Sequence, residues 1–162
     1  MNPDTGIEYA GYIEAELATE RERTDRLLGR ATRIQQLGGA VVTVFAALLG
    51  AFGRGPLRTW SGLVFAAFVV SVAAALVASL IAEWSRSFEV SDAETFNHMT
   101  TDKWNDPSPH ARLAVARARA DAIKSLRAAN NKRVGYVDAG NIAVLVALVL
   151  GATESTLRAT GH

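Results

Sequence analysis

The sequence predicts an all-α integral membrane protein: a transmembrane helical hairpin, a third span, and cytoplasmic amphipathic helices. Three observations predict this class. The apolar residues form long uncharged blocks, the first two blocks are joined by a short connector of helix breakers, and Lys and Arg are distributed unequally between the connecting segments. The chain has 162 residues, one domain's worth. Its hydrophobic content of 49% and charged content of 20% would suit a soluble protein, but the segregation into blocks favours a membrane protein.

The hairpin is expected within residues 34–83. Residues 59–82 run for 24 positions without a charge or a proline, and about 20 apolar residues suffice to cross a bilayer as a helix. The run hardly alternates polar and apolar faces, as a soluble core helix would. An earlier uncharged run covers 34–53, and the connector between the two runs reads RGPLR, a pattern typical of a tight turn. Trp60 stands where an interfacial indole is expected.

Residues 1–33 show the pattern of an amphipathic helix. Tyr9, Ile13 and Leu17 are four positions apart, and acids and arginines occupy the other face. One interpretation is a solvated helix leading into the first span, and the other is an oligomerising helix. No proline separates this helix from the first span, so one continuous helix is compatible with the sequence. The acids among these residues do not fit a secretory signal, so we expect the first hydrophobic segment to be retained.

The segment 84–133 is polar and ends in a basic helix expected over 109–133. Ser108 suits an N-cap and Pro109 a first helical residue. The helix could lie on anionic headgroups, pack antiparallel on the acidic N-terminal helix, or bind nucleic acid; its lack of aromatics argues against nucleic acid. We favour the two-helix bundle. The residues predicted to contact headgroups or a partner are Arg112, Arg117, Arg119, Lys124 and Arg127.

A third span is expected over 134–153. Its uncharged part is only 15 residues long, which is marginal for a crossing, and the extension back to Val134 includes Asp138 and Asn141. The alternative is a helix that lies against the first two spans. Asp138 could act as a structural anchor near the headgroups, or it could line a pore together with Asn141. Residues 154–162 are expected to be a tail without structure.

The distribution of positive charge predicts the orientation. Fourteen Lys and Arg precede the first span or lie between the second and third spans, and three lie in the connector and the tail. Since positive charge gathers on the cytoplasmic side, the N-terminus and residues 84–133 are expected in the cytoplasm, with the spans in the cell inner (plasma) membrane.

Small residues recur four positions apart in each apolar run. Such faces let helices approach closely, and close packing drives association in lipid. These contacts could form within one chain or between chains, which makes a homo-oligomer an expected state. The predicted packing residues are Gly39, Thr43 and Ala47 in the first run, Ala67, Ser71 and Ala75 in the second, and Ala143 and Ala147 in the third.

Several kinds of chemistry find no support in the sequence. There are no cysteines, and no nucleophilic triad, phosphate loop or paired-histidine motif is present, so we expect no enzyme and no cofactor. Glu94, His98 and Asp102 could share one helix face, but a lone histidine in a polar segment is usually a surface residue, and no metal site is expected. The net charge of +1 makes nucleic acid an unexpected partner.

Two stretches resemble a known class of proteins. They are YIEAELATERERTDRLLGRATRIQQLGGAVVTVFAALLG and LRAANNKRVGYVDAGNIAVLVALVLGA, less than half of the chain. Their layout is similar to that of SLATT-type and Pycsar-type transmembrane effectors of bacterial anti-phage defence. The resemblance implies oligomerisation and a breach or depolarisation of the inner membrane when a signalling partner acts. Because the chain lacks a clear nucleotide-binding module, sensing of the signal would have to come from elsewhere.

Three functional hypotheses follow. The first is a self-associating small inner-membrane protein that alters membrane permeability in a defence or signalling response. The second is a passive membrane scaffold or regulatory subunit that recruits a cytoplasmic partner through helix 109–133. The third is a phage-type membrane protein, either holin-like or one that excludes other phage.

Overall fold

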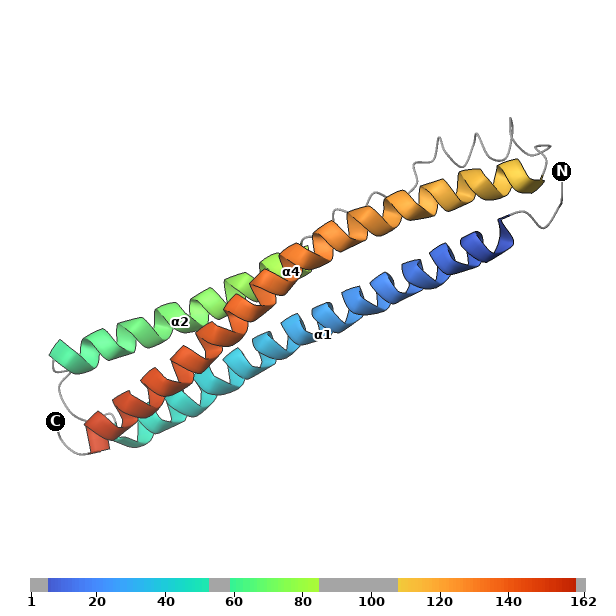
Figure 1. Cartoon of the computed structure of the whole chain (residues 1–162). Coiled ribbons are helices and arrows are strands. Elements are labelled where there is room, and N and C mark those ends of the chain that lie inside the picture. Colours follow the sequence, from blue (N-terminus) through green and yellow to red (C-terminus); the bar gives the residue numbers. More distant parts are fainter. Residues whose placement is uncertain (1–5, 53–58, 85–107, 160–162) are drawn as a thin grey trace. The chain divides into compact units, whose positions relative to one another are not determined.

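The computed structural model is all-helical over the residues that it describes, 6–52, 59–84 and 108–159 (Figure 1). Its helices are α1 (Ile7–Phe52), α2 (Thr59–Trp84) and α4 (Ser108–Ala159). Each contains a stretch long and apolar enough to cross a membrane, which confirms the all-α class with three such helices. The connector 54–58 and the polar residues up to 107, including Glu94, His98 and Asp102, lie outside the described residues.

The chain divides into two units, each described by itself below. The charged unit consists of Met1–Arg26 and Arg86–Asn131, and the apolar unit of Leu27–Ser85 and Lys132–His162. Helices α1 and α4 each contribute to both units. They have 46 and 52 residues, whereas a bilayer crossing needs about 20.

The predicted boundaries after residue 33 and after residue 133 are not helix ends. The amphipathic helix continues into the first apolar run as α1, and the basic helix 109–133 continues into the third as α4. No proline interrupts either junction. Gly135 is the weakest helix former next to the second one, and an interior glycine costs only about 1 kcal/mol relative to alanine.

The expectation of an unstructured tail is wrong for residues 154–159, which form the last turn and a half of α4. An ion pair one turn apart supports this end, because Arg158 Nε lies 2.6 Å from Glu154 Oε1. Glu154 itself is fully buried. The tail prediction relied on the polarity of these residues, and it missed that their side chains bind one another.

In the apolar unit α1 and α4 run parallel, and α2 runs antiparallel to both (Figure 1). The close contacts of two α4 glycines show this. A Cβ added at Gly140 would lie 3.1 Å from Ile34 Cδ1 and 3.6 Å from the Ala75 carbonyl oxygen. One placed at Gly151 would lie 3.4 Å from Phe68 and 3.5 Å from Phe45. Residue numbers therefore rise together in α1 and α4 and fall in α2.

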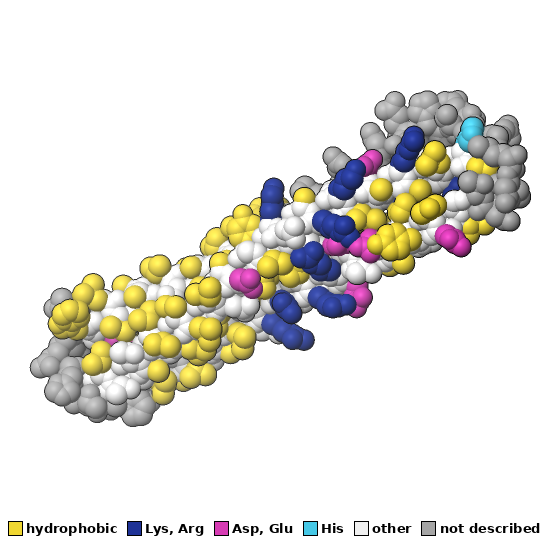
Figure 2. All heavy atoms as spheres, in the orientation of Figure 1, with side chains coloured by type: hydrophobic (Ala, Val, Ile, Leu, Met, Phe, Trp, Pro, Cys, Tyr) yellow, Lys and Arg dark blue, Asp and Glu magenta, His cyan; other side chains and the backbone are white. Residues whose placement is uncertain are grey.

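Two clusters form the interior of the apolar unit. One contains Ala31, Ile34, Ala75, Ala82, Val137 and Val144, and the other contains Phe45, Phe68, Val72 and Ala147. Alanine makes up half of the first cluster, where it allows close helix approach, and the second cluster contains two phenylalanines and one alanine. The rings of Phe45 and Phe68 lie 4.2 Å apart between centroids. Hydrophobic side chains cover the visible outer face of this unit (Figure 2).

In the charged unit α1 and α4 are parallel, so the predicted antiparallel bundle is wrong. Leu17 packs with Ile123 and Leu126, and the polar contacts join Glu14 to Arg119 and Thr24 to Asn130. The two helices therefore advance together. The physical reason is the order of complementary residues, since side chains of α1 meet their apolar, arginine and amide partners in the same order along α4.

Candidate functional site

Two fully buried charged residues of α4 stand out in the apolar unit, Arg133 and Glu154. Arg133 is the last residue of the predicted basic helix 109–133, and Glu154 is the first residue of the predicted tail. An isolated charge is costly to bury, so buried charges are expected to have partners. Both of these charges have a hydrogen-bond partner in α2, one near each of its ends.

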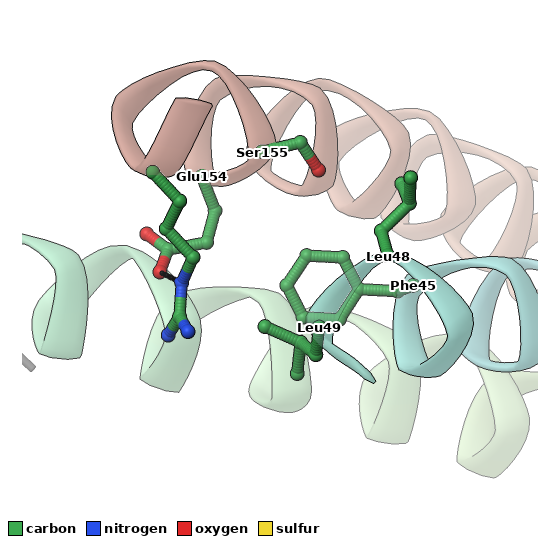
Figure 3. Close-up of a pocket in the computed structure, with 6 residues that line it drawn as sticks. Phe45, Leu48, Leu49, Glu154 and Ser155 are labelled. Atoms are coloured by element: carbon green, nitrogen blue, oxygen red, sulfur yellow. Dashed lines mark hydrogen bonds and ion pairs between the residues drawn. The ribbon is translucent and has the colours of Figure 1, made fainter. Parts of the chain in front are cut away.

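Glu154 of α4 lies beside the N-terminal end of α2. Its Oε1 accepts a 2.5 Å hydrogen bond from Ser61 Oγ and a 2.6 Å hydrogen bond from Arg158 Nε. Figure 3 shows Glu154 and Ser155 of α4 with Phe45 and Leu49 of α1 around a small pocket, which Arg158 also lines. Ser61 is the third residue of α2, where the helix dipole is positive and stabilises a nearby carboxylate. Glu154 Oε2 is buried and has no hydrogen-bond partner among the described residues.

Arg133 of α4 lies beside the C-terminal end of α2. Its Nε donates a 3.2 Å hydrogen bond to the carbonyl oxygen of Ala82, in the last turn of α2. The last four carbonyls of a helix lack partners within it, and the dipole there favours a positive charge. A second contact joins this end to α1, because Thr32 Oγ1 lies 3.3 Å from Glu83 Oε1.

The distance between these two sites matches a bilayer. Arg133 and Glu154 stand 21 positions apart on α4, and at a rise of about 1.5 Å per residue this gives roughly 30 Å, the thickness of the hydrocarbon core. Trp60 and Trp84, at the two ends of α2, are 77% and 86% exposed, as expected of interfacial indoles. The polar groups therefore stand where an apolar helix would meet the two membrane surfaces.

The charged unit contains a partly buried polar network between α1 and α4. Arg127 Nε donates to Glu20 Oε1 over 2.8 Å, and Asn130 Nδ2 lies 3.2 Å from Glu20 Oε2. Thr24 Oγ1 lies 3.1 Å from Asn130 Oδ1, and Arg127 also pairs with Glu16. Glu20, Thr24 and Asn130 are all buried. Such a network sets the register of the two parallel helices, because a shifted pairing would leave buried polar groups without partners.

The charges within this network shift two pKa values. Burial acts to raise the pKa of Glu20, but the hydrogen bonds from Arg127 and Asn130 and the nearby positive charges outweigh it and lower that pKa. The hydrogen bond to Glu20 raises the pKa of Arg127. Both shifts favour the charged forms that make the contact.

The five predicted basic residues have different surroundings. Arg119 lies 3.1 Å from Glu14, and Arg127 pairs with Glu16 and Glu20, so these two arginines contact acids of α1. Lys124 pairs with Asp121 of its own helix at 3.0 Å. Arg117 is exposed and Arg112 is half-buried.

The predicted packing residues also divide into two groups. Ala75 and Ala147 are buried in the two interior clusters, and Ala143 packs against one of them. Ser71 is half-buried. The others are exposed on the apolar unit; they are Gly39, Thr43, Ala47 and Ala67.

Asp138 and Asn141 lie on the outer face of α4. Both are exposed, and neither makes a side-chain hydrogen bond within the described part of the chain. The exposed hydroxyls of Thr43 and Thr153, in contrast, donate to their own helix backbone. Asp138 and Asn141 share their face with Leu145, Leu148 and Ala152, which are also exposed, at alternating spacings of three and four residues. We call these five residues the α4 seam.

An apolar groove of about 370 Å³ runs between α1 and α2 in the apolar unit. Its lining consists of apolar side chains, including Phe45, Phe65 and Phe68. Among residues 6–52, 59–84 and 108–159, no group of three or more acids, histidines or cysteines could hold a metal ion. A comparison with protein-family models, curated proteins and solved structures finds no match to this chain.

Proposed function

We propose that the protein is a self-associating membrane protein whose assembly alters the permeability of the inner membrane. The observation that carries this proposal is the α4 seam. An ionisable residue inside a membrane segment almost always faces other helices or a water-filled cavity, because exposure to lipid is costly. In this proposal Arg133 lies at one membrane surface, and Asp138 stands five residues further along α4, inside the membrane segment. The Asp138 side chain is exposed on the apolar unit.

The spacing of the seam supports a second copy as its partner. Exposed residues at 138, 141, 145, 148 and 152 follow the alternation of three and four that characterises the contact stripe of paired helices. Leu145 is 62% exposed in the single chain. Association through this stripe would surround Asp138 and Asn141 with the same groups of neighbouring copies, and a ring of such groups would admit water and ions.

The orientation predicted from the charges and the resemblance to a family of effectors are both part of this proposal. With the charged unit in the cytoplasm, the excess of Lys and Arg is on the side where it is usually found. The resemblance to SLATT-type and Pycsar-type effectors implies the same output, depolarisation on a signal. The charged unit would then receive that signal from a cytoplasmic partner.

Membrane potential tests this function. We expect a voltage-sensitive dye to report loss of potential when the chain is expressed, and Leu145→Ala with Leu148→Ala to abolish the loss along with oligomer formation in detergent. Thr153→Val is the matched control, because Thr153 is exposed on α4 but outside the seam. A seam variant that depolarises cells as strongly as the parent would refute the proposal.

A second candidate function is a membrane scaffold that recruits a cytoplasmic protein. It is favoured by the exposed aromatics of the charged unit, since Tyr9 and Tyr12 are 78% and 70% exposed. Large exposed aromatics often anchor protein interfaces. Harmless expression together with a partner that is lost on Tyr9→Ser and Tyr12→Ser would favour this function over the first.

A further inference from the structure

The two ends of α2 are held unequally. At its C-terminal end Ala82 accepts from Arg133 of α4, and Glu83 accepts from Thr32 of α1. At its N-terminal end the described polar contact with the other helices is the Ser61–Glu154 hydrogen bond. By polar contacts, one end is therefore tied to two helices and the other to α4, while Phe68 of α2 also packs on Phe45 of α1.

One carboxylate oxygen at the Ser61–Glu154 contact has no hydrogen bond among the described residues. Both of its donors converge on Glu154 Oε1, and Oε2 is buried with no partner among the described residues. An unsatisfied buried oxygen carries the full cost of its lost hydration. Moving α2 away would break one hydrogen bond but would also let water reach Oε2. The contact is therefore easier to open than one in which both oxygens are satisfied.

We propose that the Ser61–Glu154 contact is a releasable clamp, which keeps the apolar unit closed until α2 swings outward about its Arg133-held end. This inference rests on the proposed function for its output, because the closed unit is the state in which the membrane stays sealed. The clamp is a contact between α2 and α4, so it can be tested without any measurement of permeability.

The test measures distances between α2 and α4 in the full chain in lipid nanodiscs. The sequence has no cysteine, so paired cysteines carry the only spin labels. The exposed pair Leu63→Cys and Thr153→Cys reports the clamped end, and the exposed pair Leu80→Cys and Ala139→Cys reports the other end. Dilution of labelled chain into excess unlabelled chain restricts the distances to those within one molecule.

Ser61→Ala is the decisive variant, because it removes the hydroxyl and little volume. We expect it to raise the population with a longer 63–153 distance roughly tenfold, a typical effect of one lost buried hydrogen bond, and to leave the 80–139 distance unchanged. Glu154→Gln should act in the same direction. Ser79→Ala is the matched control, since Ser79 is also a buried serine of α2 and its hydroxyl donates to the Leu76 carbonyl of its own helix. Distances in Ser61→Ala and Glu154→Gln equal to those of the control would overturn the clamp, as would equal separation at both ends.

Dye release from proteoliposomes separates the clamp from the proposed function. We expect Ser61→Ala to release dye several times faster than the parent and Ser79→Ala to match the parent. A longer 63–153 distance with no release from any variant would support the clamp and overturn the permeability function. Faster release with no change in distance would overturn the clamp and support that function.

Discussion

Arg127 of α4 donates a 2.8 Å hydrogen bond to Glu20 of α1, and this contact joins two residues 107 positions apart in the chain. Asn130 completes it by approaching both the other carboxylate oxygen and the backbone carbonyl of Glu20 at 3.2 Å. The three residues hold two parallel helices at one register within the charged unit. They also make the stability of that unit depend on pH.

Acid should loosen the charged unit. The pKa of Glu20 is lowered in the folded protein, so its contribution to stability is complete above the ordinary Glu pKa and is lost as the pH falls through the lowered value. We expect amide hydrogen exchange in residues 13–24 to show falling protection over that acidic range. Glu20→Gln should remove this pH dependence and lower protection at neutral pH, whereas Glu22→Gln, at an exposed residue, should preserve both. Identical profiles for the two variants would contradict the role of Glu20.

Removal of the Arg133 side chain should destabilise the apolar unit. Arg133→Met leaves the Ala82 carbonyl without this donor, and an unsatisfied buried group costs about 1–3 kcal/mol. Lys132→Gln, at the exposed neighbour, should change stability by no more than about 0.5 kcal/mol. Thermal unfolding in detergent, followed by circular dichroism, checks this. A melting temperature for Arg133→Met equal to that of Lys132→Gln would show that Arg133 contributes nothing.

Two glycines of α4 should respond in opposite directions. A Cβ at Gly140 would meet Ile34 at 3.1 Å, so Gly140→Val overpacks the contact and should cost about 1–3 kcal/mol. No atom lies within 4 Å of a Cβ at Gly135, so Gly135→Ala should stabilise the helix by about 1 kcal/mol. The same melting experiment measures both, and a loss of stability in Gly135→Ala would mean that an additional contact covers this position.

Substitutions at two alanines distinguish an effect on folding from an effect on assembly. Ala75 is fully buried and Ala47 is exposed, although the sequence predicts helix packing at both. Ala75→Leu should lower the melting temperature, because a full interior must expand to admit it. Ala47→Leu should leave the melting temperature unchanged and alter oligomer size only if a second copy packs there. Size-exclusion chromatography with light scattering gives the oligomer size, and a normal melting temperature for Ala75→Leu would contradict the described interior.

The sequence by itself determined that the protein is helical and has three apolar segments. Uncharged runs such as 59–82 indicate helices directly, since in lipid a helix satisfies all of its own backbone groups. It also indicated that the acids of residues 1–33 could pair with the arginines of helix 109–133, of which Arg119 and Arg127 do so. These properties depend on composition and on spacing along one helix.

Only the tertiary structure decided which residues are inside. Glu154 looked like part of a polar tail, and Arg133 like the end of a basic helix, because their partners, Ser61 and the Ala82 carbonyl, are distant in the sequence. Likewise Ala75 and Ala47 belong to the same kind of pattern, and only one of them faces another helix. A small-residue face shows that close packing is possible, but the rotation of each helix about its axis determines which face is buried. That rotation depends on contacts among all three helices.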